Sequence, residues 1–136
     1  MTVAYLVSRS LLKYYSGAIT MSEIPIWRMK HIASTNAHLP ASPGLYAIGN
    51  EDEICGLEIG RIYVYVGKTG NLRRRLSEHT HLTELHPDLG GYLRRYRGKA
   101  KIWYTSNVAA DDLDTLERRL IRELKPIYNR VKYEKG

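Results

Sequence analysis

The 136-residue chain has no phenylalanine, a single cysteine and no long apolar run. The shortage of cysteine and of apolar runs excludes several kinds of site and several classes of protein. One cysteine, Cys55, excludes an internal disulfide and a zinc cluster built from cysteines. No apolar stretch approaches the roughly 20 residues that a membrane-spanning helix needs. The apolar run at residues 3–7 is also too short for the core of a secretory signal. We therefore expect an intracellular, cytoplasmic protein that is unprocessed and has no membrane partner.

The residues that are abundant favour a polyanionic partner. Tyrosine occurs 11 times, so hydroxyl groups accompany most of the aromatic side chains. The formal net charge is +7 and the pI is near 9.6. An excess of basic over acidic residues is typical of nucleic-acid-binding domains, although many small basic proteins bind no nucleic acid. A hydrophobic content of 43% is enough for one packed core.

The pattern along the chain predicts an N-terminal extension followed by one domain. Residues 34–43 are rich in Ser, Asn, Pro and Ala, which is typical of a turn or linker. We therefore place the extension at residues 1–40 and the domain at residues 41–136. Two apolar groups in the extension are compatible with separate elements, the first helical: Leu6, Leu11, Leu12 and Tyr15, and then Ile24, Ile26, Trp27, Met29 and Ile32.

Three segments predict the strands of a small antiparallel sheet, at residues 45–48, 62–66 and 101–105. Residues 49–61 are expected to form a long hairpin connection between the first two. In the second segment the residue types alternate, which predicts one face for each set. The two expected sets are Ile62, Val64 and Val66 on one face, and Tyr63 and Tyr65 on the other.

Three further segments predict helices. Residues 69–79 carry Leu72 and Leu76 as an apolar pair, and residues 89–96 predict a second short helix. Residues 111–125 open with acidic residues, close with basic ones and precede a proline, as helices commonly do. The predicted fold class is therefore α/β, a three-stranded antiparallel sheet flanked by helices.

Glu117 lies inside the apolar stripe of the last predicted helix, which is unusual for a carboxylate. An ionised carboxylate at the edge of a core costs several kcal/mol unless it is paired or coordinated. One interpretation is a glutamate that reaches solvent or pairs with an arginine. The other is a ligand of a hard cation, since one carboxylate with waters and a phosphate suits Mg²⁺. The stripe consists of Leu113, Leu116, Leu120, Ile121 and Leu124.

Basic residues on the first predicted helix are candidates for phosphate binding. Arg75 and His79 are four residues apart and share one helical face. A solvated basic helix is the ordinary explanation, whereas a phosphate-facing helix would use the bidentate guanidinium. Lys68, where strand meets helix, is well placed for a second phosphate contact.

Tyr46 and Tyr65 lie on the first and second predicted strands. Tyrosines are common in sheets, so cross-strand packing explains them without any chemistry. Alternatively, a phenol near a cation could accept a proton from water if its pKa were lowered.

Two triplets, Gly44-Leu45-Tyr46 and Tyr65-Val66-Gly67, resemble the two signatures of the GIY-YIG nucleases, with leucine and valine at the isoleucine positions. Residues 71–76 resemble the family's basic helix. Arg75 matches its arginine, and His79 matches the position four residues later where members carry histidine or tyrosine.

Two more elements extend this resemblance to residues 43–130. Glu117, within residues 116–121, resembles the family's metal-binding glutamate segment. Asn129, within residues 125–129, matches the asparagine of its closing motif. Five elements in order at familiar spacing make the resemblance specific.

The resemblance implies metal-dependent hydrolysis of DNA phosphodiesters, by a restriction-type or a structure-specific endonuclease. It implies that Glu117 holds Mg²⁺, for which Mn²⁺ can substitute, to neutralise the scissile phosphate and the leaving oxygen. Tyr46 would orient or deprotonate the attacking water, and Tyr65 would position water or phosphate. Arg75 would stabilise charge on the phosphoryl oxygens, assisted by Lys68 and His79. Asn129 would brace the site.

The DNA backbone is expected to contact further basic residues. Residues 1–40 and the hairpin at 49–61 are left for recognition, which suggests a homodimer that reads a short site or a shape-selective enzyme. The alternatives are a catalytically inactive nucleic-acid-binding module of the same fold and, ranked last, a protein-interaction domain. The expected DNA contacts are Lys68, Arg73, Arg74, Arg94 and Arg95, with Arg97 nearby in sequence.

Overall fold

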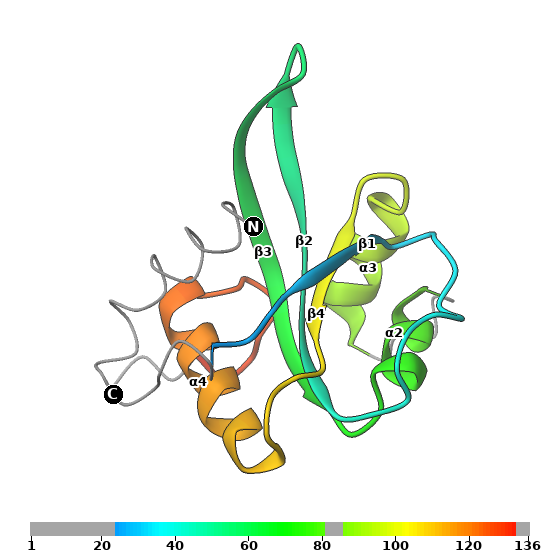
Figure 1. Cartoon of the computed structure of the whole chain (residues 1–136). Coiled ribbons are helices and arrows are strands. Elements are labelled where there is room, and N and C mark those ends of the chain that lie inside the picture. Colours follow the sequence, from blue (N-terminus) through cyan, green and yellow to red (C-terminus); the bar gives the residue numbers. More distant parts are fainter. Residues whose placement is uncertain (1–23, 81–85, 133–136) are drawn as a thin grey trace.

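The computed structural model describes residues 24–80 and 86–132, which form a four-stranded sheet with helices on both faces (Figure 1). The strands are β1 (Arg28–His31), β2 (Gly44–Ile54), β3 (Leu57–Thr69) and β4 (Lys101–Thr105). Their order across the sheet is β1-β4-β2-β3, and all neighbouring pairs are antiparallel. The strand β3, which carries the second signature triplet, therefore lies at an edge of the sheet.

The helices form two layers. One face of the sheet is covered by α2 (Leu72–Thr80) and α3 (Pro87–Arg95), and the other by α4 (Leu113–Leu124) (Figure 1). A 3-10 turn, η2 (Ala110–Asp112), leads into α4. Within the described residues, no helix is both long and apolar enough to span a membrane.

Alternate residues of β2 pack against the two helical layers. Tyr46 and Ile48 belong to the larger core, which contains the buried leucines of α2 and α3. Leu45 and Ala47 belong to two smaller clusters with residues of α4. Because both faces of β2 are covered, residues 45–48 form a continuous apolar run. The buried helical residues that contact the two faces are Leu72, Leu76, Leu89 and Leu93, and Leu113, Leu116 and Ile121.

The three predicted helices and the strand at residues 101–105 are confirmed, with boundaries that differ by a few residues. Leu72 and Leu76, the apolar pair of α2, are completely buried. The helix α4 ends at Lys125, which adopts a left-handed conformation (φ 48°) and donates its N–H to the Ile121 carbonyl. Pro126 follows this cap, as is common after helix ends.

The sheet has four strands rather than the predicted three, because β1 pairs with the outer edge of β4. Within β1 only Lys30 is buried, and the Met29 side chain is 44% exposed. The strand therefore lacks the alternation of apolar residues that marks a strand in a sequence. Ile24 and Ile32, which flank it, are buried, so the second apolar group of the extension contributes to the core. The first group, at residues 6–15, lies outside the described residues.

Residues 49–61, expected to form a long connection, are instead mostly strand. Here β2 and β3 continue as a two-stranded ribbon that projects from the sheet and ends in the tight turn of Cys55 and Gly56 (Figure 1). These two residues have φ of 54° and 83°, the combination that a type I′ hairpin turn requires. The acidic residues at positions 51–53 of β2 have low strand propensity, so this part of the strand was not predicted from the sequence. Pairing across the ribbon compensates, including an ion pair of 3.7 Å between Arg61 and Glu51.

A β-bulge at Val64 interrupts the register of the hairpin. Tyr65 pairs with Ile48 and Tyr63 pairs with Gly49, so Val64 is an extra residue on β3. The two strands approach closely at this point, and a Cβ atom built on Gly49 would lie 1.9 Å from a carbonyl oxygen of β3. Glycine is therefore required opposite the bulge.

The bulge also reverses part of the predicted alternation of β3. Val64 and Tyr65 both pack against the core beneath α2 and α3, whereas Tyr63 and Val66 pack beside α4. The prediction that Val64 and Val66 share a face is therefore wrong, since one extra residue shifts the pleat. No register shift lies between Tyr65 and Gly67, the partner of Tyr46, and Tyr65 lies on the same face of the sheet as Tyr46.

Substitution of Gly49 by alanine should destabilise the protein, because the new Cβ atom would collide with the Ile62 carbonyl. We expect the free energy of unfolding to fall by about 1–3 kcal/mol, as for other overpacked sites. Urea denaturation measures this change. The control is Gly98→Ala, where a Cβ atom would meet no described atom within 4 Å. Equal stability of the two variants would contradict the requirement for glycine at the bulge.

Candidate active site

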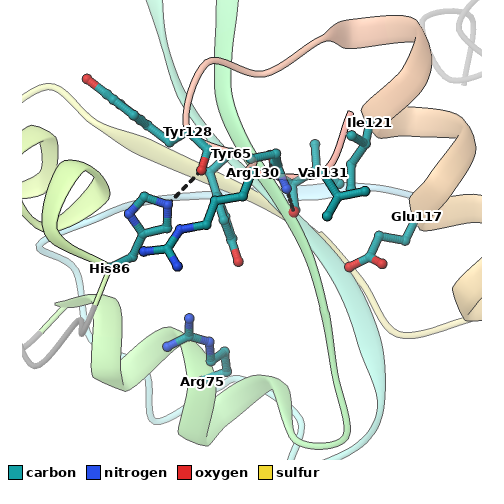
Figure 2. Close-up of a pocket in the computed structure, with 10 residues that line it drawn as sticks. Tyr65, Arg75, His86, Glu117, Ile121, Tyr128, Arg130 and Val131 are labelled. Atoms are coloured by element: carbon teal, nitrogen blue, oxygen red, sulfur yellow. Dashed lines mark hydrogen bonds between the residues drawn. The ribbon is translucent and has the colours of Figure 1, made fainter. Parts of the chain in front are cut away.

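A cleft of about 440 Å³ lies between α2, the edge strand β3 and α4. Arg75 reaches it from α2 and Glu117 reaches it from α4, on different sides of the opening (Figure 2). The segment after α4 completes the wall. The other residues that line the cleft are Tyr65, Val66, His86, Ile121, Tyr128, Asn129, Arg130 and Val131.

Glu117 is half-buried in this cleft, and burial raises the pKa of its carboxyl above the ordinary value. The positive charge of Lys68 and a hydrogen bond from the Lys68 backbone offset part of this effect. Within residues 24–80 and 86–132, no lysine or arginine lies within ion-pairing distance of the Glu117 carboxylate. The arrangement therefore disfavours the interpretation of Glu117 as one half of a buried salt bridge.

A half-buried carboxylate without a counter-ion fits a divalent cation. Mg²⁺ prefers oxygen ligands and is commonly bound by one or two carboxylates, with waters and a phosphate filling the other positions. In the described part of the chain, no three His, Cys, Asp or Glu side chains converge as a metal-binding group. The residues present therefore suit a cation with few protein ligands better than a zinc site or a closed calcium cage.

Two guanidinium groups provide positive charge in the same cleft. Arg75 Nη1 donates a hydrogen bond of 3.0 Å to Glu78 Oε1, one turn further along α2. Arg130 follows the closing motif, and its guanidinium extends over the same opening (Figure 2). Arginine presents several N–H donors in a plane, which matches the oxygens of a phosphate. The cleft thus combines a carboxylate with two anion-binding groups.

The three predicted aromatic site residues lie together, but only one of them lines the cleft. The Tyr46 hydroxyl and His79 Nε2 are 3.1 Å apart, and both side chains are buried, with Tyr46 only 1% exposed. The Tyr65 ring centroid lies 6.1 Å from that of Tyr46 and 6.2 Å from that of His79. Tyr65 therefore contacts the cleft, with Tyr46 and His79 behind it. Their chemical roles remain predictions.

Gly67, the last residue of the second triplet, is required by the position of Tyr46. A Cβ atom built on Gly67 would lie 2.6 Å from the Tyr46 hydroxyl oxygen. The two residues face each other across the β2–β3 pair. A larger residue at position 67 would displace the tyrosine ring, so the two triplets depend on each other.

Asn129 fixes the segment after α4 to the edge of β3. Its side chain accepts a hydrogen bond of 2.9 Å from the Val66 N–H and donates one of 2.8 Å to the Val66 carbonyl. One residue earlier, the Tyr128 N–H donates to the carbonyl of Val64, the bulge residue, at 2.9 Å. The amide of Asn129 therefore takes the place of a neighbouring strand at the edge of the sheet.

His86 connects α3 to the same segment. Its Nδ1 accepts the Leu89 N–H at the start of α3, and its Nε2 lies 2.8 Å from the Tyr128 carbonyl oxygen. This pattern assigns the ring proton to Nε2, since the carbonyl can only accept. The sequence patterns do not identify His86 or Arg130 as lining residues. The only local signals are the position of His86 before a helix-opening proline and that of Arg130 after the closing motif.

The remaining predicted residues do not line the cleft. Lys68 donates to Asp114 at 2.6 Å, and this hydrogen bond raises the pKa of the Lys68 ammonium group. The Nε of Arg73 donates to the Leu39 carbonyl at 2.8 Å, on another side of α2. The predicted DNA contacts Arg74, Arg94 and Arg95 are exposed on α2 and α3.

The raised pKa of Glu117 predicts how metal-free stability depends on pH. A carboxyl with a raised folded-state pKa stabilises the fold at low pH, and this contribution is lost as pH rises through that pKa. In EDTA at pH 7, the Glu117→Gln variant should therefore have a Tm equal to or above that of the original chain. The difference should disappear near pH 4. A Glu117→Gln Tm that is lower at pH 7 would contradict the conclusion that burial destabilises the ionised form of Glu117.

Comparisons with known proteins identify the fold and the family. The model of the GIY-YIG catalytic domain matches residues 43–133. The chain is also similar to the GIY-YIG N-terminal endonuclease domain of UvrC from Thermotoga maritima, solved with magnesium as its catalytic divalent cation. The identity is 22% and the TM-score 0.50, over 72% of this chain and 94% of that chain.

Two point mutants of the same UvrC domain, each bound to the catalytic divalent cation, give a TM-score of 0.52 at 21% and 22% identity. Each match covers 74% of this chain and 96% of that chain. Such identities establish a shared fold. No match was found among the curated proteins. Because the family model covers well over half of the sequence, the chain belongs to the GIY-YIG catalytic domain family.

Proposed function

We propose that this protein is a metal-dependent endonuclease that hydrolyses phosphodiester bonds in DNA. One observation carries the proposal: the carboxylate of Glu117, half-buried and with no ion-pair partner among the described residues, lines one cleft with the guanidinium groups of Arg75 and Arg130. A phosphodiester needs cationic groups around its oxygens, and a divalent cation needs a carboxylate ligand. The cleft provides both.

Glu117 would hold the cation, Mg²⁺ or Mn²⁺, and the bound cation would supply charge neutralisation at the scissile phosphate. Arg75 and Arg130 would hold the other phosphate oxygens. Phosphate binding by Arg75 would compete with Glu78, whose carboxylate accepts a hydrogen bond from Arg75 at 3.0 Å. The two arginines would stabilise the negative charge that develops on the phosphoryl oxygens during attack.

Tyr65 is the tyrosine that we assign to the attacking water, since its ring lines the cleft and the Tyr46 ring does not. Tyr46 and His79 would act through Tyr65, because they pack behind it and hold each other through a contact of 3.1 Å. Asn129 would keep β3 and the Arg130 backbone in register through its two hydrogen bonds to Val66.

The ribbon at residues 49–61 is poorly suited to contact the DNA backbone. It contains Glu51, Asp52, Glu53 and Glu58 but only one basic residue, Arg61, so its formal charge is −3 in a chain of net charge +7. Phosphates would be repelled from this ribbon and attracted to the rest of the surface. We therefore favour a structure-specific enzyme that recognises DNA shape over a restriction-type enzyme that reads bases with the ribbon.

Cleavage assays with supercoiled and branched DNA test the proposal directly. We expect nicking that requires Mg²⁺ or Mn²⁺, and a loss of at least about 100-fold in rate for Glu117→Gln, as for removal of one charge-stabilising group. The matched control is Glu123→Gln, which removes an exposed carboxylate of the same helix and should leave the rate unchanged. DNA binding without cleavage in either metal would instead indicate an inactive binding module.

A further inference from the structure

A second polar cleft, of about 410 Å³, lies on the side of α2 that faces away from the active site. Arg73, Ser77 and Thr80 line it from α2 at a spacing that places them on one face of the helix. Arg75 is only two residues from Arg73, but at 100° per residue it points in nearly the opposite direction. The helix α2 therefore separates the two clefts.

Two arginines give this cleft a concentrated positive charge. Arg73 Nε donates to the Leu39 carbonyl at 2.8 Å, and an Arg97 Nη1–H donates to the Thr80 carbonyl. These bonds orient both guanidinium groups and engage one nitrogen of each, so further N–H donors remain on both. Hydroxyl and amide groups of Ser34 and Asn36 line the opposite wall.

The charge of these two arginines is not neutralised within the described part of the chain. Neither lies within ion-pairing distance of a described carboxylate, and no described acidic residue lines the cleft. Arg61, Lys68 and Arg75, by contrast, each pair with a carboxylate. Two guanidinium groups that line one cleft with hydroxyl groups, and that have no described carboxylate partner, have the chemistry of a phosphate-binding site.

We propose that this cleft binds a second phosphodiester of the DNA backbone, beside the one that is cut. The inference rests on the proposed function, which places DNA against the Arg75 side of α2. A helix with its side chains is about 10 Å wide, and phosphates follow each other every 3.4 Å along the axis of each strand. The second phosphate therefore lies about three nucleotides from the scissile one. Arg75 on one side of α2, and Arg73 with Arg97 on the other, would then hold the backbone across this helix.

Salt-dependent DNA binding in EDTA tests this site without any need for cleavage. Removal of one phosphate contact lowers the slope of log K against log salt by about 0.9. We expect Arg97→Gln and Arg73→Gln each to show this change, with roughly 3- to 10-fold weaker binding at low salt. The charge-matched control is Lys99→Gln, an exposed lysine beside the acidic ribbon, whose slope should stay unchanged. Equal slopes for Arg97→Gln and Lys99→Gln would overturn the inference.

A scan of neutral methylphosphonate linkages provides a second test, the first part of which uses the original chain alone. One neutral linkage should weaken binding of the original chain, at a position about three nucleotides from the cut. The same linkage should have no added effect on Arg97→Gln, because the contact is already lost. Additive effects would show that Arg97 and that phosphate do not meet. Inorganic phosphate is the control ligand. If it binds the original chain but not Arg97→Gln, while both proteins bind DNA equally, the cleft binds a free anion and the inference is overturned.

The two proposals can fail separately. A chain that shows the reduced slopes but never cleaves DNA would refute the nuclease function and retain the phosphate site. A chain that cleaves DNA with unchanged slopes in Arg73→Gln and Arg97→Gln would retain the function and refute the second site.

Discussion

The pairing of the Asn129 side chain with the Val66 backbone is the constraint on which the site depends. An edge strand presents unpaired backbone groups, and here one amide satisfies the N–H and the carbonyl of Val66 together. The same segment connects to the bulge residue Val64 through Tyr128 and to the start of α3 through His86. The segment that follows α4 is thereby fixed across β3. Without it, Arg130 would have no defined position relative to Arg75 and Glu117.

The electrostatics of the cleft indicate a site built for ligands rather than for stability. Burial raises the pKa of the Glu117 carboxyl, and the described residues offer this group no ion-pair partner. Perturbed carboxylates of this kind are typical of functional sites, because a structural role would be served better by an apolar side chain. Asp114, one turn earlier, shows the contrast: it pairs with both Lys68 and Arg118, which lowers its carboxyl pKa. One helix thus carries a carboxylate with two ion-pair partners and another that has none among the described residues.

The sequence predicts those parts of the fold that local patterns determine. The run at residues 45–48 is apolar because helices cover both of its faces, and the stripe of α4 is apolar because it packs on the sheet, so both can be recognised in the sequence. The strand β1 was not predicted, because its own residues show no strand pattern and only its pairing with β4 makes it a strand. The bulge at Val64 was missed because one extra residue changes the faces without changing the composition. Glu117 was found as an exception to a pattern, whereas Arg130 lies in no pattern and enters the cleft only through the tertiary contacts of Asn129.

The central claim is that one carboxylate, Glu117, holds a divalent cation in the cleft between α2 and α4. Paramagnetic broadening of backbone amide signals by Mn²⁺, measured by NMR on the labelled full chain, tests this most directly. The account predicts the strongest broadening at Val66, Lys68 and Glu117, and its loss in Glu117→Gln. Broadening centred on the acidic ribbon at residues 51–58, or broadening that persists in Glu117→Gln, would contradict it.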